Sequence, residues 1–439
     1  MKKQPPRHPS SSTLATGPDV RQTWRKTRWV TLTLLLLAGV INFLDRSSLS
    51  IANRSIRSEL HLSGTQIGAL LSAFSLAYGL SQLPIGPLLD RFGARRVLGT
   101  GLGVWSLAQM LTGTVTGLRS FVPLRVLLGM GEAPFFPASV KLVRERFMLA
   151  ERGRAMAAVN VSTTLGQGLA PPLLTVLMLH FGWRHMFMLI GALGLLLALV
   201  WFPLLRDRRA PDENVDQRST EETAPVSISF QQWSSLFRSR TIWGLMIGFG
   251  GINYTAWFYI AWLPSYLEGE RLVSVALSGW LAAIPFLAGS LGMYLSGVVA
   301  DRKGREGQSL AQVHRKQILL GMMFSAAFTL LAARAANVGM AVACISMALF
   351  SIHFAGTSAW GYVQAASPRP IVATVGSIQN FGSFVVASAA PVLTGWLLDR
   401  THSFKTAFLF CAAMALLGAA SYFALVRNSI DLTSNRLEP

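Results

Sequence analysis

The chain has 439 residues, of which 51% are hydrophobic and only 13% are charged. Water-soluble proteins carry about 25% charged residues, so this composition excludes an ordinary soluble enzyme. The formal net charge of +19 would suit a nucleic-acid-binding protein, and the positions of the basic residues decide whether that class applies.

Apolar stretches recur along the chain, each long enough to cross a bilayer as a helix, which takes about 18 or more residues. We therefore expect an all-α, polytopic membrane protein with about twelve transmembrane helices. Their predicted positions are residues 29–53, 65–89, 96–116, 120–140, 155–179, 185–205, 241–267, 275–300, 317–336, 338–366, 371–396 and 404–426.

One long polar interval separates these helices into two groups of six and predicts a linker between two halves. The first apolar stretch is too long for the core of a signal peptide and lacks a small-residue cleavage pattern, so we expect it to remain as the first helix. The predicted parts are an N-terminal tail at 1–28, a six-helix bundle at 29–205, the linker at 206–240, a second six-helix bundle at 241–426 and a tail at 427–439.

The basic residues gather on one side of the predicted membrane. If the N-terminus is cytoplasmic, the inside segments hold 29 of the 39 Lys and Arg residues, the outside loops hold 8, and Arg46 and Arg125 lie within helices. This is the positive-inside bias that orients membrane proteins. The charge therefore predicts a multi-pass protein of the cell (inner) membrane, with both termini and the linker in the cytoplasm, and gives no support to nucleic-acid binding.

A short motif occurs at corresponding places in the two halves. Residues 86–96 (GPLLDRFGARR) follow the second predicted helix, and residues 297–305 (GVVADRKGR) follow the eighth. Glycine permits close helix approach, and Asp beside Arg can pair with basic groups and helix ends of a neighbouring helix, which predicts a latch for one conformation. The alternative is a tight basic turn that serves topology alone. The predicted latch residues are Gly86, Asp90, Arg91, Gly93, Arg95, Asp301 and Arg302.

The repeated motif resembles the signature loop of the major facilitator superfamily, and the resemblance runs from Trp29 to about Val426. Residues 42–46 (NFLDR) and 125–134 (RVLLGMGEAP) resemble the anion:cation symporter branch, which includes bacterial hexonate, hexuronate and glucarate transporters. The resemblance implies two pseudo-symmetric six-helix bundles around a central site that alternates between inward-open and outward-open states. It also implies a monomer.

Four charged side chains lie well inside the predicted helices: Asp45 and Arg46 in the first, Arg125 and Glu132 in the fourth. A lone charge at a helix centre costs roughly 2.5–3.5 kcal/mol, so we expect the four to face one another. Arg125 and Glu132 are two helical turns apart and project from one face, whereas Asp45 and Arg46 point about 100° apart. The four predict a transport site; the alternative is a pair of ion bridges that only fasten two helices.

By similarity to the sugar-acid carriers, Arg46 would bind the substrate carboxylate and Glu132 would be the coupling proton site. A guanidinium matches a carboxylate bidentately, so the substrate would compete with Glu132 for Arg46, and Glu132 would then gain affinity for a proton. Asp45 and Arg125 would form a second titrating pair. Because an inside-negative potential expels a monoanion, we expect co-transport with at least two protons.

Uncharged polar residues inside the helices are candidates for substrate contacts, because a polyol acid needs many donors and acceptors. The resemblance favours Tyr78, Trp360 and Asn380, whereas sugar-acid carriers often have Gln where this chain has Thr164. For every candidate the alternative is an interhelical hydrogen bond, and His353 could instead belong to the proton path. The predicted substrate-binding residues are Arg46, Tyr78, Thr164, Gln167, Trp360, Gln379 and Asn380, and the weaker candidates are Gln82, Thr163, Asn253, Tyr254, His353 and Ser358.

The sequence has no phosphate-binding glycine motif, no metal-ligand cluster and no nucleophile beside a base, and Cys344 and Cys411 lie in apolar stretches. We expect no enzyme activity, no cofactor and no metal site. The preferred hypothesis is proton-coupled import of a small organic anion, such as a galactonate-like hexonate or a hexuronate. The alternatives are efflux or exchange of another carboxylate or a drug, and a membrane sensor that binds the anion without transport.

Overall fold

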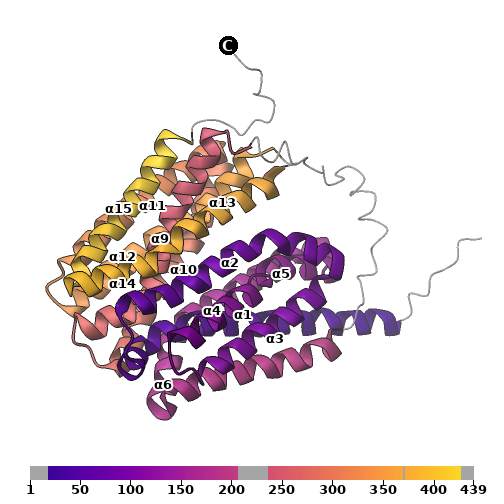
Figure 1. Ribbon diagram of the computed structural model, residues 1–439. Helices are drawn as coiled ribbons and strands as arrows, with labels where there is room; N and C mark the ends of the chain where they lie inside the picture. The colour runs from indigo at the N-terminus through magenta and orange to yellow at the C-terminus, as the bar shows by residue number, and fades with distance from the viewer. Residues whose placement is uncertain (1–17, 206–235, 369–370, 427–439) are drawn as a thin grey trace, which may run out of the picture.

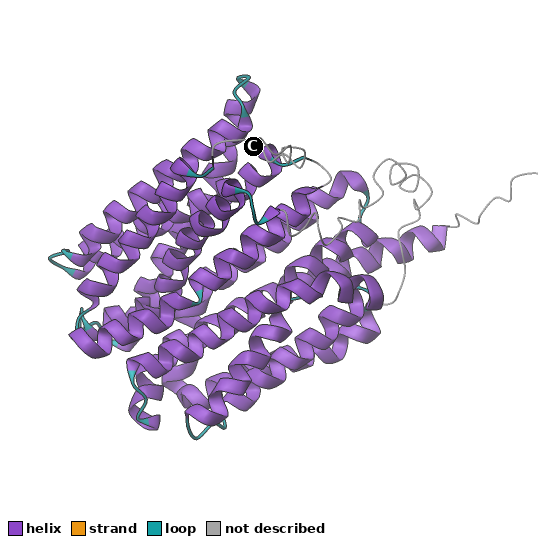
Figure 2. Cartoon of the chain, turned by 45° about the horizontal axis from the view of Figure 1, so that its top comes forward, coloured by secondary structure: helices purple, strands orange, loops and turns teal. Residues whose placement is uncertain are grey.

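The computed structural model describes residues 18–205, 236–368 and 371–426, and within these ranges it contains helices and short loops but no strand (Figure 2). Nine helical stretches in this part of the chain are long and apolar enough to cross a membrane. One of them, α6 (Leu149–Leu204), holds two spans, because Gly182 interrupts the helix with a φ of 77°. With α3 (Ala94–Thr112) and α9 (Arg240–Gly269), the described helices make twelve spans, which confirms the predicted all-α polytopic fold.

The N-terminal bundle contains the first six spans, and its helix ends follow from local sequence. Ser63 and Gln66 form a reciprocal capping box that starts α2, and such a box satisfies two backbone donors that the helix cannot. The predicted span at 120–140 consists of two helices, α4 and α5, which break at Pro134. The helices of this bundle are α1 (Pro18–Leu60), α2 (Gly64–Phe92), α3, α4 (Leu118–Glu132), α5 (Phe135–Arg146) and α6.

The C-terminal bundle repeats this plan with the last six spans. Its eleventh span, predicted at 371–396, is again two helices, α13 and α14, which meet at Ser388. Residues 1–17, 206–235 and 427–439, which hold most of the predicted tails and linker, lie outside the described residues, and α1 begins at Pro18, inside the predicted tail. The helices are α9, α10 (Val275–Arg305), α11 (Leu310–Ala333), α12 (Val338–Ala366), α13 (Val372–Ala387), α14 (Ala389–Thr401) and α15 (Phe404–Ala424).

The two bundles lie side by side and meet most closely at one end (Figure 1). We name this the closed end; it holds the start of α2 and the end of α14. The opposite end, where α6 ends at Leu204 and α9 begins at Arg240, is named the linker end. In Figure 1 the ribbons of the two bundles diverge toward the linker end.

Asp399 on α14 joins the bundles at the closed end. Its carboxylate accepts hydrogen bonds from the backbone N–H of Gly64 at 2.8 Å and of Thr65 at 2.7 Å, and from the Thr65 hydroxyl at 2.6 Å. The Arg57 guanidinium lies 3.8 Å away. An acid at a helix N-terminus is stabilised by the free N–H groups and by the helix dipole, so Asp399 acts as a cap supplied by the other bundle.

Glycine allows this contact, because a methyl group on Gly395 would come within 2.1 Å of the Gly64 carbonyl oxygen. Two further pairs of helices contact each other across the bundles near the closed end. Ser50 on α1 donates to the Ala261 carbonyl of α9 at 2.8 Å, and α10 packs against α6 where Gly279 faces Thr175. The closed end is therefore tied at three pairs of helices.

Candidate functional site

A cavity of about 880 Å³ lies between the two bundles, at mid-length of the helices. Its walls come from α1, α5 and α6 of one bundle and from α9, α10, α12 and α13 of the other. A volume of roughly 300–1,000 Å³ is typical of a site for a small molecule. Among the described residues that line the cavity, Arg46 is the one that carries a permanent charge.

Arg46 reaches from the cavity wall into the N-terminal bundle, where its Nε donates to Glu132 Oε2 at 2.7 Å. Glu132 is fully buried and Arg46 is 9% exposed. Removing one partner of a buried ion pair costs about 3–5 kcal/mol, because the other charge is left uncompensated. A ligand that displaces Glu132 from Arg46 therefore leaves the buried Glu132 carboxylate without its counterion.

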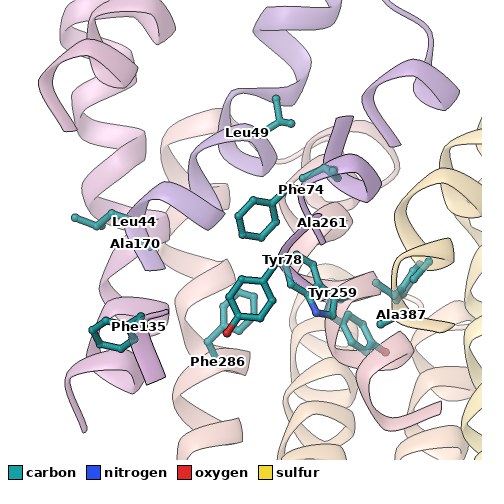
Figure 3. Close-up of a cluster of buried hydrophobic side chains, with 14 of the residues drawn as sticks. Leu44, Leu49, Phe74, Tyr78, Phe135, Ala170, Tyr259, Ala261, Phe286 and Ala387 are labelled. Carbon is teal, nitrogen blue, oxygen red and sulfur yellow. The ribbon is translucent and has the colours of Figure 1, made fainter. Parts of the chain in front are cut away.

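Three aromatic rings surround the Arg46 guanidinium. Its central carbon lies 4.6 Å from the ring centre of Tyr78, 5.1 Å from that of Phe43 and 5.6 Å from that of Phe74. Figure 3 shows Phe74 and Tyr78 next to each other at this level of the bundle. Cation–π attraction and the lack of bulk water around these rings fix the guanidinium and strengthen its electrostatic interactions.

Close packing of α4 places Glu132 beside Arg46. A methyl group on Gly129 would come within 2.4 Å of the Phe74 carbonyl oxygen of α2, and one on Gly131 would meet Trp105 of α3. The helix then ends at Glu132, one residue after Gly131, where the chain breaks toward α5. The glycines of the GMGE sequence therefore let α4 press into the bundle and direct the carboxylate inward.

Asp45 and Arg125 complete the buried charge cluster, which comprises Asp45, Arg46, Arg125 and Glu132. The guanidinium of Arg125 packs on the rings of Phe121 at 5.3 Å and Phe187 at 5.5 Å. In this state Asp45 and Arg125 are electrostatically coupled, but the described residues show no direct ion pair between them. The four charges thus gather as the sequence predicts, with one of the two expected pairs formed.

The uncharged candidates divide between the cavity and the helix packing. Thr164, Gln167 and Trp360 line the cavity. Tyr78 does not line it but lies behind Arg46 and packs on Phe384 of α13, with ring centres 5.0 Å apart. Gln379 is fully buried and Asn380 is partly buried; neither is among the residues that line the cavity in this state. Their assignment to the substrate stays a prediction.

Several lining residues were not singled out from the sequence. Thr357 lines the cavity, whereas the neighbouring Ser358 faces away and bonds with Ser296 and Gln317. Asn160 lies one turn before Thr164 and is exposed in the cavity. Because Asn160 and Thr164 lie one turn apart on the same helix face, the sequence spacing could have predicted Asn160 as a lining residue. Ser47, Ser290 and Tyr294 complete the polar lining, along with the weaker candidates Thr163, Asn253 and His353.

The predicted latch residues lie at the linker end, and their described contacts stay within each bundle. Lys141 of α5 contacts Asp90 at 2.8 Å and the Leu89 carbonyl. Arg95 donates to the Phe202 carbonyl at 2.7 Å. Gly93, with a φ of 80°, makes the tight turn from α2 to α3. Gly86 and Arg91 are exposed on the last two turns of α2.

The second copy of the motif is likewise local in this state. Asp301 and Arg302 are exposed on the last turns of α10, and Arg302 contacts Glu306 of the same helix end at 3.3 Å. A hydrogen bond from Lys303, together with the hydrogen bond from Arg302 and the charges of both residues, holds the pKa of Glu306 below its usual value. Glu306 therefore stays ionised at neutral pH. The contacts described at this end include none that latches one bundle to the other.

Comparison with known proteins identifies this architecture. A family model described as "Major Facilitator Superfamily" matches residues 35–391. The chain belongs to the major facilitator superfamily. It is accordingly a multi-pass membrane transporter and not an enzyme, and the resemblance inferred from the repeated motif is confirmed. Within the described residues, no cluster of three or more His, Cys, Asp or Glu side chains could hold a metal ion.

Several known transporters resemble this chain over nearly its whole length. A "Probable L-galactonate transporter" of Escherichia coli is 47% identical over 431 residues, covering 96% of this chain and 95% of the relative. A "Probable galactarate/D-glucarate transporter GarP" of E. coli is 31% identical, covering 93% and 96%. A "Hexuronate transporter" of Bacillus subtilis is also 31% identical, covering 90% and 93%.

Solved structures of other transporters have the same fold at low sequence identity. A bacterial homologue of the human lysosomal transporter Spinster, in an inward-facing and unoccupied conformation, has a TM-score of 0.77 at 17% identity and covers 92% of this chain. The xylose transporter XylE from E. coli, in an inward open conformation, has a TM-score of 0.73 at 12% identity. At these identities the comparison supports the fold of this major facilitator.

Proposed function

We propose that this protein imports a six-carbon sugar acid, a hexonate such as L-galactonate, together with protons across the cell (inner) membrane. The observation that carries the proposal is the Arg46–Glu132 pair, which joins a cation on the cavity wall to a buried acid. The names of these relatives support a sugar acid as the substrate class. Both walls of the cavity come from one chain, so a monomer is sufficient.

The coupling follows from competition for one guanidinium. When the substrate carboxylate pairs with Arg46, Glu132 is left buried without its counterion, and an isolated buried carboxylate favours the protonated form. Substrate and proton therefore bind cooperatively, and by thermodynamic reciprocity a proton gradient drives the anion uphill. In the empty site the Arg46–Glu132 pair re-forms after the proton has left.

Alternating access completes the cycle. The bias of Lys and Arg toward one side supports a cytoplasmic linker end and cytoplasmic termini. The ties between the bundles at the closed end then support an inward-open state, with the outside gate shut. In the opposite state the Asp90 and Asp301 motifs would join the bundles at the linker end.

The proposal is tested by uptake of radiolabelled L-galactonate into proteoliposomes with an acidic exterior. We expect accumulation driven by the pH gradient in the wild type, and at least a tenfold loss of that accumulation in Glu132→Gln. Counterflow, which needs no proton gradient, should persist in this variant. Undiminished pH-driven accumulation by Glu132→Gln would refute the coupling role, and counterflow without any pH-driven accumulation in the wild type would favour an exchanger.

A further inference from the structure

His353 on α12 is a buried polar group in the cavity wall, and the proposed coupling mechanism does not use it. It is 9% exposed, lines the cavity from the C-terminal bundle, and therefore lies across the cavity from Arg46 of the N-terminal bundle. Arg46, Tyr294 and His353 are the titratable residues among those that line the cavity.

Two contacts fix the His353 ring. Its Nδ1 lies 2.9 Å from the Leu349 carbonyl oxygen, one turn back on the same helix. A carbonyl only accepts hydrogen bonds, so Nδ1 must carry the ring proton and donate. The ring also packs on Gly289 of α10, where even a methyl group would come within 2.9 Å of Nδ1. These two contacts hold the ring in its present orientation.

This arrangement determines what the remaining nitrogen can do. In the neutral ring with its proton on Nδ1, Nε2 has a lone pair and no hydrogen, so it accepts hydrogen bonds and cannot donate. A substrate hydroxyl satisfies such a group. A second carboxylate does not, because it offers only lone pairs and a negative charge, and the cavity wall holds one permanent cation, Arg46.

We propose that His353 is a specificity-determining residue that accepts a hydrogen bond from a substrate hydroxyl, and so selects a polyhydroxy monocarboxylate over the corresponding dicarboxylate. This inference rests on the proposed function and deepens it. Arg46 holds the carboxylate at one end of the substrate, and the opposite wall admits a hydroxyl where a dicarboxylate would place its second charge. A site built to pair with a hydroxyl rejects analogues that cannot pair there.

Galactonate and galactarate are a matched ligand pair, because they share a six-carbon polyol chain and differ at one end, which is CH₂OH or a carboxylate. The purified full chain in nanodiscs is titrated with each acid by calorimetry at constant pH. We expect the wild type to bind galactonate at least tenfold more tightly. In His353→Phe, galactonate binding should weaken about tenfold, the loss of roughly one hydrogen bond, and the preference between the two acids should shrink.

His353→Gln and Gly289→Ala separate the role of Nε2 from the packing of the ring. Gln offers both an acceptor and a donor, so it should retain galactonate and bind galactarate better than the wild type does. Gly289→Ala keeps the imidazole but displaces it, so it should weaken galactonate binding, with little added loss when combined with His353→Phe. His314→Gln, a half-buried histidine of α11 outside the cavity lining, is the matched control and should behave as wild type.

The outcomes distinguish this inference from the proposed function. If the wild type binds neither acid, the proposed substrate class is wrong. If it binds both acids equally, or if a folded His353→Phe keeps wild-type affinity and preference, the role of His353 is refuted while hexonate transport stands. If His353→Gln keeps its affinity but loses pH-driven accumulation, His353 is part of the proton path, which also overturns the inference.

Discussion

In the proposed mechanism the Arg46 guanidinium serves two carboxylates in turn, and its surroundings suit that role. The aromatic rings of Phe43, Phe74 and Tyr78 hold its plane without neutralising its charge. Its Nη2 is buried and, among the described residues, makes no hydrogen bond in this state. The fork of donors therefore keeps bonding capacity for a second carboxylate while Nε contacts Glu132.

Lysine should not replace this guanidinium. We expect Arg46→Lys to weaken L-galactonate binding by about tenfold or more, because an ammonium group lacks the planar fork that bonds a carboxylate bidentately and stacks on rings. Isothermal titration measures the affinity. Arg54→Lys, on the same helix and outside the cavity lining, is the control and should retain the affinity. Equal affinities of wild type and Arg46→Lys would remove Arg46 from the carboxylate site.

The four buried charges could be predicted from the sequence, because an ionisable group in a membrane must find partners inside the protein. The sequence could not predict which of the uncharged polar residues face the cavity. Thr357 and Asn253 face the cavity, whereas their neighbours Ser358 and Tyr254 are buried in helix packing. Lipid tails are as apolar as the packed interior, so hydrophobic periodicity does not reveal how a membrane helix is rotated.

Among the helices, α2 and α14 contribute most clearly to the difference between the two ends. Asp399 caps the first turn of α2 from the other bundle, whereas Asp90 at the end of α2 contacts Lys141 within its own bundle. The positions of the spans were predictable from apolar length. Pro134 is a sequence signal for the break between α4 and α5, whereas the break at Ser388 between α13 and α14 lies inside a continuous apolar stretch and was not predicted.

Removing the Asp399 cap should open the closed end more often. The substitution Asp399→Ala removes three hydrogen bonds to α2. Losing a helix cap costs about 1 kcal/mol or more, so the population of molecules that are open at the closed end should rise about fivefold or more. The reporter is Ser50→Cys, a position that is 2% exposed at the closed end. The cysteine at position 50 is labelled with a membrane-impermeant maleimide in a chain whose own two cysteines are removed by Cys344→Ala and Cys411→Ala. We expect Asp399→Ala to raise its labelling rate about fivefold.

Glu59→Gln is the matched control for this measurement. Glu59 also lies near the closed end, but its 2.9 Å contact with Arg184 stays inside the N-terminal bundle. Its loss should leave the labelling rate of Ser50→Cys unchanged. A similar increase in both variants would indicate general loosening of the fold, and no increase with Asp399→Ala would show that the cap does not set the balance between the two states.

For the molecule as a whole, the membrane potential acts on the net charge of the substrate and the protons that cross the membrane with it. One elementary charge crossing 100 mV is worth roughly 2.3 kcal/mol, which equals a factor of about 50 in an equilibrium accumulation ratio. A monoanion alone is expelled by an inside-negative potential, a monoanion with one proton is indifferent to it, and one with two protons is drawn inward. Asp45 and Glu132, both fully buried, would supply two acids for the last case in the proposed mechanism.

We therefore expect an inside-negative potential to increase L-galactonate accumulation by the wild type, measured in proteoliposomes with a potassium diffusion potential and no pH gradient. Asp45→Asn should leave one proton per substrate, because Asn cannot ionise, so its accumulation should follow the pH gradient and ignore the potential. Both should transport faster as the outside pH falls, since protons enter with the substrate. Wild-type accumulation that does not respond to the potential would refute the two-proton stoichiometry, and an unchanged response in Asp45→Asn would place the second proton on another residue.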